Sequence, residues 1–413
     1  MLSRGPFRSR AFRWVWGGEA VSMLGDASYE VVFAWLVLSV TGSPAGLGAV
    51  MLAATIPRGL LLLVGGAITD RLSPRLLMLG AHVARGVAVG ALAVLSAAHA
   101  LHVWHLFAIG VVVGIAEAFF WPASGSIMPS LVDETDLPRA NAVFGVAEQA
   151  SRLAGPLLGG ALMVWAGVPA ALGFNALTFF FAAGTVLAAP RREVTAGARI
   201  SVGAVLGEIR AGLSYARRNV EVRIVLLVVA ASALSYSGLF AVGLPALSRN
   251  FGNGSLVLGA MFSAWGLGQL VGTVSATVTG LPQRWGLLII GMAVAEGTSF
   301  AVLGVVPRYQ LAVVLLALLG AGVAYSSDVA LPSFVQTTTP AAMLGRVNSL
   351  LDLPRVALAP LSIAGMGLLA AIDVRWAFAF AALPMLLVGL GLATNRQARG
   401  LTSRAGGSDA GSR

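Results

Sequence analysis

Three acidic residues fall on one face of an otherwise apolar stretch near the N-terminus. Glu19, Asp26 and Glu30 are spaced by 7 and 4 residues, so on an α-helix they lie within about 40° of one another. Desolvation and mutual repulsion both penalise the charged form of such carboxyl groups. The pattern therefore indicates groups that bind and release protons. Asp26, the deepest of the three, is the first candidate, and Glu30 is the second.

Further ionisable residues interrupt later apolar stretches. Glu117 and Asp328 have no partner at helical spacing, and we expect them to be alternative proton or substrate sites. A charge in apolar surroundings is costly unless it is paired, so each of these residues must face a partner or a polar cavity. The other ionisable residues in these stretches are Arg58, Arg85, Glu148, Arg152, Glu296, Asp352 and Arg355.

The spacing of these charges predicts some of their partners. Glu148 precedes Arg152 by four residues and Asp352 precedes Arg355 by three, which suits ion pairs along one helix. Arg58 and Arg152 have two open roles. Either they pair with the acids of the first stretch, or they bind an anionic substrate.

The composition indicates that these charges lie in a protein surrounded by lipid. The chain has 413 residues, of which 57% are hydrophobic and 11% charged, whereas an average soluble domain carries about 25% charge. We therefore expect an all-α membrane protein. All 27 basic residues are Arg and there is no Cys, which excludes Lys-dependent chemistry and thiolate metal sites. The absence of HExxH, GxSxG and Walker motifs argues against an enzyme, and we expect no cofactor and no metal.

Twelve stretches are long and apolar enough to be transmembrane helices. We expect two six-helix bundles at 1–189 and 223–394, a linker at 190–222 with an amphipathic surface helix, and a disordered tail at 395–413. The predicted spans are 13–40, 46–69, 76–98, 105–131, 141–165, 170–189, 223–250, 255–280, 286–306, 310–338, 347–371 and 376–394.

The arginines lie mainly on one side of these spans. If the N-terminus is cytoplasmic, 20 of the 27 Arg fall on the cytoplasmic side and 3 on the other. Such a bias orients membrane proteins. It predicts a multi-pass protein of the cell membrane with both termini cytoplasmic, and it explains the net charge of +10 without nucleic-acid binding.

A weak internal repeat relates the two halves. Gly48-Ala49 and Gly259-Ala260 begin comparable spans 211 residues apart, and the same offset relates Arg85 to Glu296. Arg139-x-Asn141 matches Arg346-x-Asn348 at an offset of 207 residues. Two pseudo-symmetric halves are typical of transporters whose binding site lies between them.

The loop after the second span carries a recognisable motif. Gly66, Asp70, Arg71 and Arg75 follow the pattern G-x-x-x-D-R-x-x-x-R, which resembles the loop motif G-x-x-x-D-R-x-x-R-[RK] of the major facilitator superfamily at its cytoplasmic gate. Arg75 occupies the last basic position of that motif, and Pro74 replaces the basic residue before it. We expect the acidic run 133–136 to bind Arg71 and Arg75 as a latch between loops, or else to be a solvated loop.

The fifth span resembles the antiporter motif of the same superfamily. Gly155, Pro156, Gly159 and Gly160 match g-x-x-x-G-P-x-x-G-G, with Ser151 in place of the first Gly. Glycine and proline give a helix that can kink and a face that packs closely.

Two further stretches are similar to the drug- and siderophore-exporting branch of the superfamily, which includes macrolide-efflux and enterobactin-exporter proteins. They begin at Leu24-Gly25-Asp26 and at Leu137-Pro138-Arg139. The resemblance implies a major facilitator fold and proton-coupled export of an amphipathic small molecule by rocker-switch alternating access.

The partners expected from this resemblance are a small-molecule substrate, protons and the lipid bilayer, and we expect a monomer. Trp121, Trp265 and Tyr325 fall within spans and are candidates to line the substrate cavity with Arg58 and Arg152. The alternative function is an importer or facilitator of an anionic metabolite, which the two arginines would bind.

Overall fold

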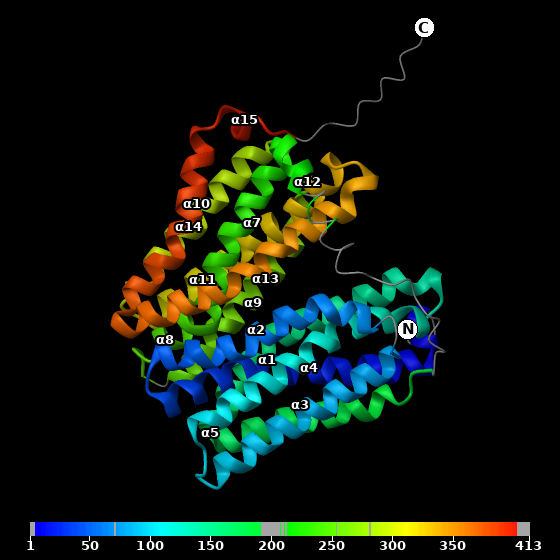
Figure 1. The fold of residues 1–413 in the computed structure, drawn as a ribbon. Coiled ribbons are helices and arrows are strands. Elements are labelled where there is room, and N and C mark those ends of the chain that lie inside the picture. The colour runs from blue at the N-terminus through cyan, green and yellow to red at the C-terminus, as the bar shows by residue number, and fades with distance from the viewer. Residues whose placement is uncertain are drawn as a thin grey trace.

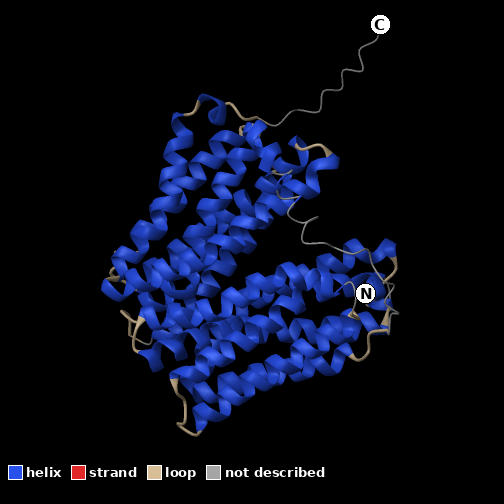
Figure 2. Ribbon diagram, in the orientation of Figure 1, coloured by secondary structure: helices blue, strands red, loops and turns tan. Residues whose placement is uncertain are grey.

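All the secondary structure is helical in the part of the chain that the computed structural model describes (Figure 2). This part comprises residues 5–69, 72–190, 207, 210, 213–252, 254–280 and 282–402, without the side chains of 62–69 and 341–342. Helices are the expected outcome, because in a bilayer every backbone N–H and C=O group must be satisfied within the protein.

The N-terminal half forms one bundle. Its elements are η1 (Gly5–Arg8), α1 (Arg10–Thr41), α2 (Pro44–Thr69), α3 (Pro74–Ala97), α4 (Val103–Ile127), η2 (Met128–Ser130), η3 (Glu134–Asp136) and α5 (Leu137–Val186). The Ser9 hydroxyl accepts a hydrogen bond from the Phe12 N–H at the start of α1, and Gly42 ends this helix with a φ of 67°. A glycine adopts this left-handed conformation with little strain.

The C-terminal half forms a second bundle, in which two helical runs contain π-helical segments. Its elements are α7 (Val220–Gly238), η4 (Leu239–Gly243), α8 (Leu244–Ser248), α9 (Gly254–Thr279), α10 (Trp285–Leu303), α11 (Tyr309–Val323), η5 (Ala324–Ala330), α12 (Leu331–Thr338), α13 (Ala341–Ile372), α14 (Val374–Thr394) and α15 (Arg396–Arg399). The segments η4 and η5 are π-helical and make α7–α8 and α11–α12 continuous runs.

Eleven helical runs in the described residues are long and apolar enough to cross a membrane. One of them, α5, has 50 residues, and as a straight helix it would measure about 75 Å, more than twice the hydrocarbon thickness of about 30 Å. Gly167, with φ 81° and ψ 167°, breaks it into two helices. These two account for the predicted spans 141–165 and 170–189, so the predicted fold with twelve spans is confirmed.

The two bundles meet at one end and diverge toward the other, as Figure 1 shows. We call the end with Gly5 and α15 the terminal end, and the end with Gly42, Gly167 and Asp373 the distal end. At the distal end the Arg249 guanidinium donates a hydrogen bond to the Gly42 carbonyl at 3.2 Å. The molecule is thus closed distally and opens toward the end that carries both termini.

Two helix pairs hold the bundles together through small residues. On α5 and α9, a Cβ added to Gly160 would lie 2.9 Å from the Ser255 carbonyl oxygen. On α2 and α13, a Cβ added to Gly48 would lie 3.2 Å from the Gly367 Cα. Gly259, the repeat equivalent of Gly48, approaches the carbonyl of Pro156 on α5 in the same way. The offsets of 211 and 207 residues therefore relate one contact to the other.

The tail differs from the prediction of disorder from 395. Residues 396–399 form α15, where Ala398 is buried and the Gly286 N–H donates to the Leu401 carbonyl. The Asn395 side chain caps this helix by accepting from two backbone N–H groups. The prediction is therefore wrong for 395–402, while 403–413 lie outside the described residues. The predicted surface helix of the linker also lies mostly outside them, with 213–218 helical.

The contact between α5 and α9 can be tested by filling it. Gly160→Val places a branched side chain against the α9 backbone, and overpacking of this kind costs about 1–3 kcal/mol. We expect the distally open population to rise about tenfold. The measurement is the distance between spin labels on Ser39→Cys and Asn250→Cys, both exposed, in a chain that has no native Cys to remove.

Gly173→Val is the matched control, since a Cβ at Gly173 meets no atom within 4 Å. An unchanged label distance in the Gly160→Val variant would show that this contact does not hold the distal end closed.

Candidate functional site

A buried chain of ionisable side chains runs through the N-terminal bundle. The Arg85 guanidinium on α3 donates a hydrogen bond to an Asp26 carboxylate oxygen on α1 at 3.3 Å, and its second terminal nitrogen lies 3.2 Å from His82 Nδ1. His82 Nε2 lies 2.8 Å from a Glu19 carboxylate oxygen. We call Glu19, Asp26, His82 and Arg85 the inner charge cluster.

The direction of these bonds follows from the groups themselves. A guanidinium only donates, so His82 Nδ1 accepts from Arg85. The ring hydrogen of His82 is then on Nε2 and is donated to Glu19. The result is a neutral His82 in a fixed tautomer, with Arg85 donating both to Asp26 and to His82. A proton arriving at Asp26 therefore changes the balance of charge around Arg85.

Arg85 is the member of the inner charge cluster whose charge is most costly to bury. Its side chain is only 2% exposed, whereas the side chain of Asp26 is 36% exposed. Phe120 on α4 and Phe179 on α5 each place a ring 4.4 Å from the guanidinium carbon, a cation–π arrangement. Four helices thus supply the surroundings of one cation, and Asp26 is the most exposed member of the cluster.

A second ion pair lies at the same level as Asp26. Arg58 on α2 and Glu117 on α4 are joined at 2.9 Å, with side chains 46% and 26% exposed. Asp26, Arg58 and Glu117 are 14 or 15 residues from the distal ends of their helices, about 21–22 Å along each axis. The sequence offered Arg58 as a substrate residue and Glu117 as a proton site. The structure brings them together as one pair.

The pairs expected from spacing are present. Arg152 bonds Glu148 at 2.9 Å, and Arg355 bonds Asp352 at 3.2 Å. All four of these side chains are exposed to a large extent, so each pair alone contributes little to stability.

The two remaining proton candidates are exposed. Glu30 lies one turn from Asp26 on α1, toward the distal end. Asp328 lies in the other bundle, in the π-helical segment η5. The structure therefore does not bring all four candidates into one cluster.

The predicted cavity aromatics have different settings. Trp121 on α4 is half-exposed. Trp265 on α9 packs against Tyr236 and Phe240 at ring distances of 5.6 Å and 4.9 Å. The Tyr325 hydroxyl donates to the Gly280 carbonyl at 2.9 Å, which places it beside the terminal end of α9.

The antiporter-like motif packs directly behind Asp26. A Cβ added to Gly155 would lie 2.5 Å from the Ala27 Cβ, and one added to Gly159 would lie 2.6 Å from the Ser28 carbonyl oxygen. The neighbouring Gly160 and Pro156 approach α9. This stretch of α5 therefore contacts both the helix that carries Asp26 and the opposite bundle.

The gate motif is described in part. Gly66, Asp70 and Arg71 lie where side chains are not described. Arg75 donates to the Leu187 carbonyl at 2.7 Å, and Asp136 pairs with Arg139 at 3.6 Å. The predicted latch between Arg75 and the acidic run is thus not observed in these contacts.

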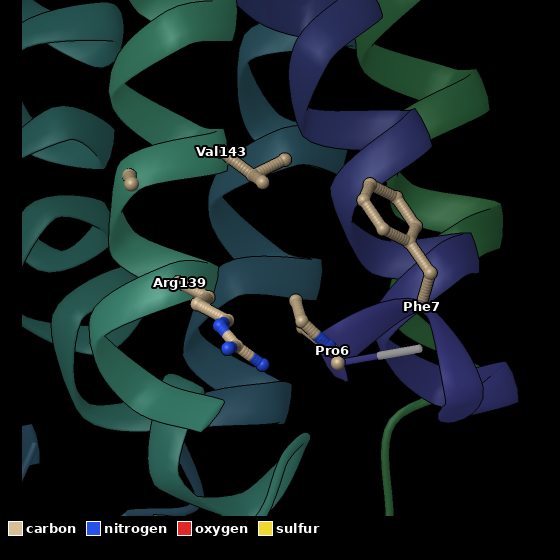
Figure 3. A pocket seen from close by; sticks show the side chains of 6 residues that line it. Pro6, Phe7, Arg139 and Val143 are labelled. Carbon is tan, nitrogen blue, oxygen red and sulfur yellow. The ribbon is translucent and has the colours of Figure 1, made fainter. Parts of the chain in front are cut away.

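A pocket of about 470 Å³ lies apart from these charges, between η1 and the first turns of α5. Figure 3 shows Pro6 and Phe7 on one side of it and Arg139 and Val143 on the other. Its lining is almost entirely apolar, and it lies at the terminal end, so it is not part of the candidate site. No group of three or more His, Asp or Glu side chains placed to hold a metal ion occurs among the described residues.

His82 is the residue that sequence reasoning missed. It lies three residues before Arg85, the helical spacing that places two side chains on one face. This spacing, in a predicted span facing the acids of α1, was the available signal. The sequence also left Arg85 without a partner, because α1 and α3 are far apart in the chain.

The chain matches one family model, described as transmembrane secretion effector, over residues 2–402. Macrolide efflux protein A of Streptococcus pyogenes is 26% identical over 349 residues, with 82% of this chain and 84% of that protein covered. Multidrug efflux pump Tap of Mycolicibacterium fortuitum is 27% identical over 382 residues, with 89% and 91% covered. Enterobactin exporter EntS of Citrobacter koseri is 27% identical over 290 residues, with 70% and 68% covered.

Solved structures agree in fold. The nucleoside transporter NupG is similar with a TM-score of 0.71 and 14% identity, over 93% of this chain and 98% of that chain. A bacterial homologue of the iron transporter ferroportin in the inward-facing state has a TM-score of 0.69 and 17% identity, also over 93% and 98%.

The buried position of Arg85 predicts a large stability effect. Arg85→Met removes a cation that is 2% exposed and leaves unpaired an Asp26 side chain that is 36% exposed, so the cost should approach but not exceed the about 3–5 kcal/mol of breaking a fully buried pair. We expect a clear fall in the thermal unfolding temperature of the detergent-solubilised protein. Adding Asp26→Asn to this variant should recover part of the loss.

The control is Arg355→Met, which breaks an exposed pair and should cost at most about 1 kcal/mol. Equal unfolding temperatures for the Arg85→Met and Arg355→Met variants would contradict a structural role for the inner charge cluster.

Proposed function

Because this chain belongs to the transmembrane secretion effector family of the major facilitator superfamily, we propose that it is a proton-coupled exporter of an amphipathic small molecule. The members of this superfamily are transporters and not enzymes. The chain is accordingly a multi-pass membrane transporter, and its direction, its coupling ion and its substrate are what the proposal adds.

One observation carries the proposal. Asp26 is a partly exposed carboxylate within a transmembrane helix. Its partner Arg85 is buried, and a guanidinium nitrogen of Arg85 lies 3.3 Å from an Asp26 carboxylate oxygen. Ionisable residues at this depth mark ion or proton pathways in membrane proteins. An exposed acid can exchange protons with water, while the fixed cation behind it makes the energy of the bundle depend on whether that acid is charged.

The nature of the relatives supports the substrate class. The similar proteins include a macrolide efflux protein, a multidrug efflux pump and an enterobactin exporter. We therefore propose a drug-like or siderophore-like substrate. The aromatic residues Trp121 and Trp265 offer surfaces for the apolar part of such a molecule, since binding sites for small molecules are mostly apolar with few polar groups.

The divergence of the two bundles toward one end suggests how a transport cycle would proceed. With both termini cytoplasmic, the bundles diverge toward the cytoplasm and the distal end is closed. Rocking of the bundles about the α5–α9 and α2–α13 contacts then exposes Asp26 to the other side. A proton entering the cell provides about 2.3 kcal/mol per 100 mV and about 1.4 kcal/mol per unit of pH difference.

Import of an anionic metabolite is the alternative. It requires Arg58 and Arg152 to bind the anion, but Glu117 and Glu148 already bond these guanidinium groups at 2.9 Å. An anionic substrate would have to displace a carboxylate from each arginine. This favours export as the first proposal.

The coupling role of Asp26 is tested by Asp26→Asn, which removes the titrating group and keeps its size. We expect proton-coupled efflux to be abolished in proteoliposomes, with a substrate identified by thermal-shift screening at two pH values. The Arg85 guanidinium keeps its bond to His82 but loses its carboxylate partner, so the variant should unfold at a lower temperature than the wild type, and efflux is measured below that temperature. Asp352→Asn removes an exposed acid outside this cluster and should leave efflux unchanged.

Efflux by the Asp26→Asn variant at the wild-type rate would sink the assignment of Asp26. Accumulation of substrate by vesicles of native orientation, without proton exchange, would favour the importer.

The proposed orientation has its own test. A green fluorescent protein fused after Arg413 should fluoresce and alkaline phosphatase fused there should be inactive, because both termini are proposed to be cytoplasmic. The opposite pair of results is expected for fusions after Arg308. Active alkaline phosphatase fused after Arg413 would contradict the proposed orientation and indicate the opposite one.

A further inference from the structure

A second buried acid lies in the C-terminal bundle, outside the site described above. Glu296 on α10 is 1% exposed. The Tyr236 hydroxyl on α7 donates a hydrogen bond to one of its carboxyl oxygens at 2.8 Å. Phe300, one turn along α10, packs edge-on against the Tyr236 ring at 5.0 Å. The carboxyl group is therefore enclosed by α7 and α10.

No cation forms an ion pair with Glu296 among the described residues. Helix α10 packs against α11, α14, α15 and η5. Arg375, Arg396 and Arg399 lie at helix ends, as does Tyr309. Asp328 lies on η5, which packs against α10, and it carries no positive charge that could pair with Glu296. The ionisable groups of these elements and of α7 near the carboxyl are Tyr236 and Asp328.

The internal repeat gives this pair a counterpart. Glu296 lies 211 residues after Arg85, and Tyr236 lies 210 residues after Asp26. In each half, the third helix of the bundle sends a buried side chain to bond a partly exposed side chain on the first helix. Asp26–Arg85 and Tyr236–Glu296 are thus the same contact in the two halves, with different chemistry.

The difference in chemistry decides the charge of each site. Arg85 is permanently charged, and Asp26 pairs with it. Among the described residues Glu296 has a phenol as its partner, and a buried carboxylate without a cation is strongly disfavoured. A bound proton removes that cost. We propose that Tyr236–Glu296 is a second proton-binding site, which holds a proton on Glu296 in this conformation and releases it when the surroundings of α7 change.

The local helix geometry supports such a change. Tyr236 lies three residues before η4, and Asp328 lies within η5, both π-helical. π-Helical segments are rare and occur frequently at functional sites. The hydrogen-bond partner of Glu296 and the acid on the neighbouring element η5 are therefore beside or within the two π-helical segments of this bundle.

The chemical step is simple. A proton binds one carboxylate oxygen of Glu296 to form the neutral acid, and its departure to water restores the carboxylate. No other bond is made or broken. As a coupling site this inference rests on the proposed export function, but the binding of the proton does not, and the experiment addresses the binding.

The experiment is an infrared pH titration of the purified full-length protein in lipid, without substrate. Spectra of wild type and Glu296→Gln are recorded from about pH 5 to about pH 9, a range that includes values documented for buried Glu. We expect a protonated-carboxyl band in the wild type that is lost in Glu296→Gln, and that disappears reversibly as the pH rises. Tyr236→Phe should shift the frequency of this band.

Asp352→Asn, which changes an exposed acid, should keep the band unchanged. A wild-type spectrum identical to that of Glu296→Gln at every pH would overturn the proposal. So would a band that persists at full intensity to about pH 9 in folded protein, because Glu296 would then be a permanently neutral structural group. Neither result depends on efflux, so failure of the Asp26→Asn test would leave this titration interpretable.

Discussion

A permanent positive charge enclosed in a bundle that faces lipid constrains much of the N-terminal half. The Arg85 guanidinium cannot lose its proton, and it is almost completely removed from solvent. Its surroundings must therefore solvate it. Asp26 supplies a carboxylate, His82 an imidazole nitrogen, and Phe120 and Phe179 the faces of two rings. These groups come from four helices, so the position of one cation fixes how those helices pack.

The bilayer imposes a second constraint, which explains the small residues of the bundle. Helices gain little from the hydrophobic effect inside a bilayer and associate through close packing. Gly155 and Gly159 let α5 approach the part of α1 that carries Asp26, and Gly160 lets it approach α9. The stretch of α5 that resembles an antiporter motif is therefore the place where α5 packs closely against both α1, which carries Asp26, and α9 of the opposite bundle.

The fold followed from the sequence to a large extent because lipid leaves so few alternatives. Long apolar stretches and the break at Gly167 determine where the spans lie, and the repeat pairs Gly48 with Gly259 before any contact is known. The pairs at helical spacing, Glu148–Arg152 and Asp352–Arg355, were predictable for the same reason. The structure of the residues after Asn395 was not predictable, because these residues are held by a hydrogen bond to α10, which is far away in the chain.

The partners of Asp26 and Arg58 could not be predicted from the sequence, for a related reason. Each contact crosses between helices, and no spacing within one helix encodes it. Arg58 pairs with Glu117 and Asp26 with Arg85, whereas charge alone equally allowed Asp26 to pair with Arg58 or Arg152. The repeat carried more information than the charges did, since the offset of 211 residues, together with offsets of 207 and 210, relates contacts of one half to contacts of the other.

The interface between the bundles has one more property. At Gly48, Gly160 and Gly259 the opposing surfaces are backbone atoms and not interlocked side chains. At these three glycines one helix can turn against the other without displacing a side chain, while close by the Ser263 hydroxyl on α9 accepts a hydrogen bond from the Leu157 N–H on α5 at 3.1 Å. In the proposed rocking cycle, a turn at these contacts would change which charged groups on either side of the interface are exposed to water.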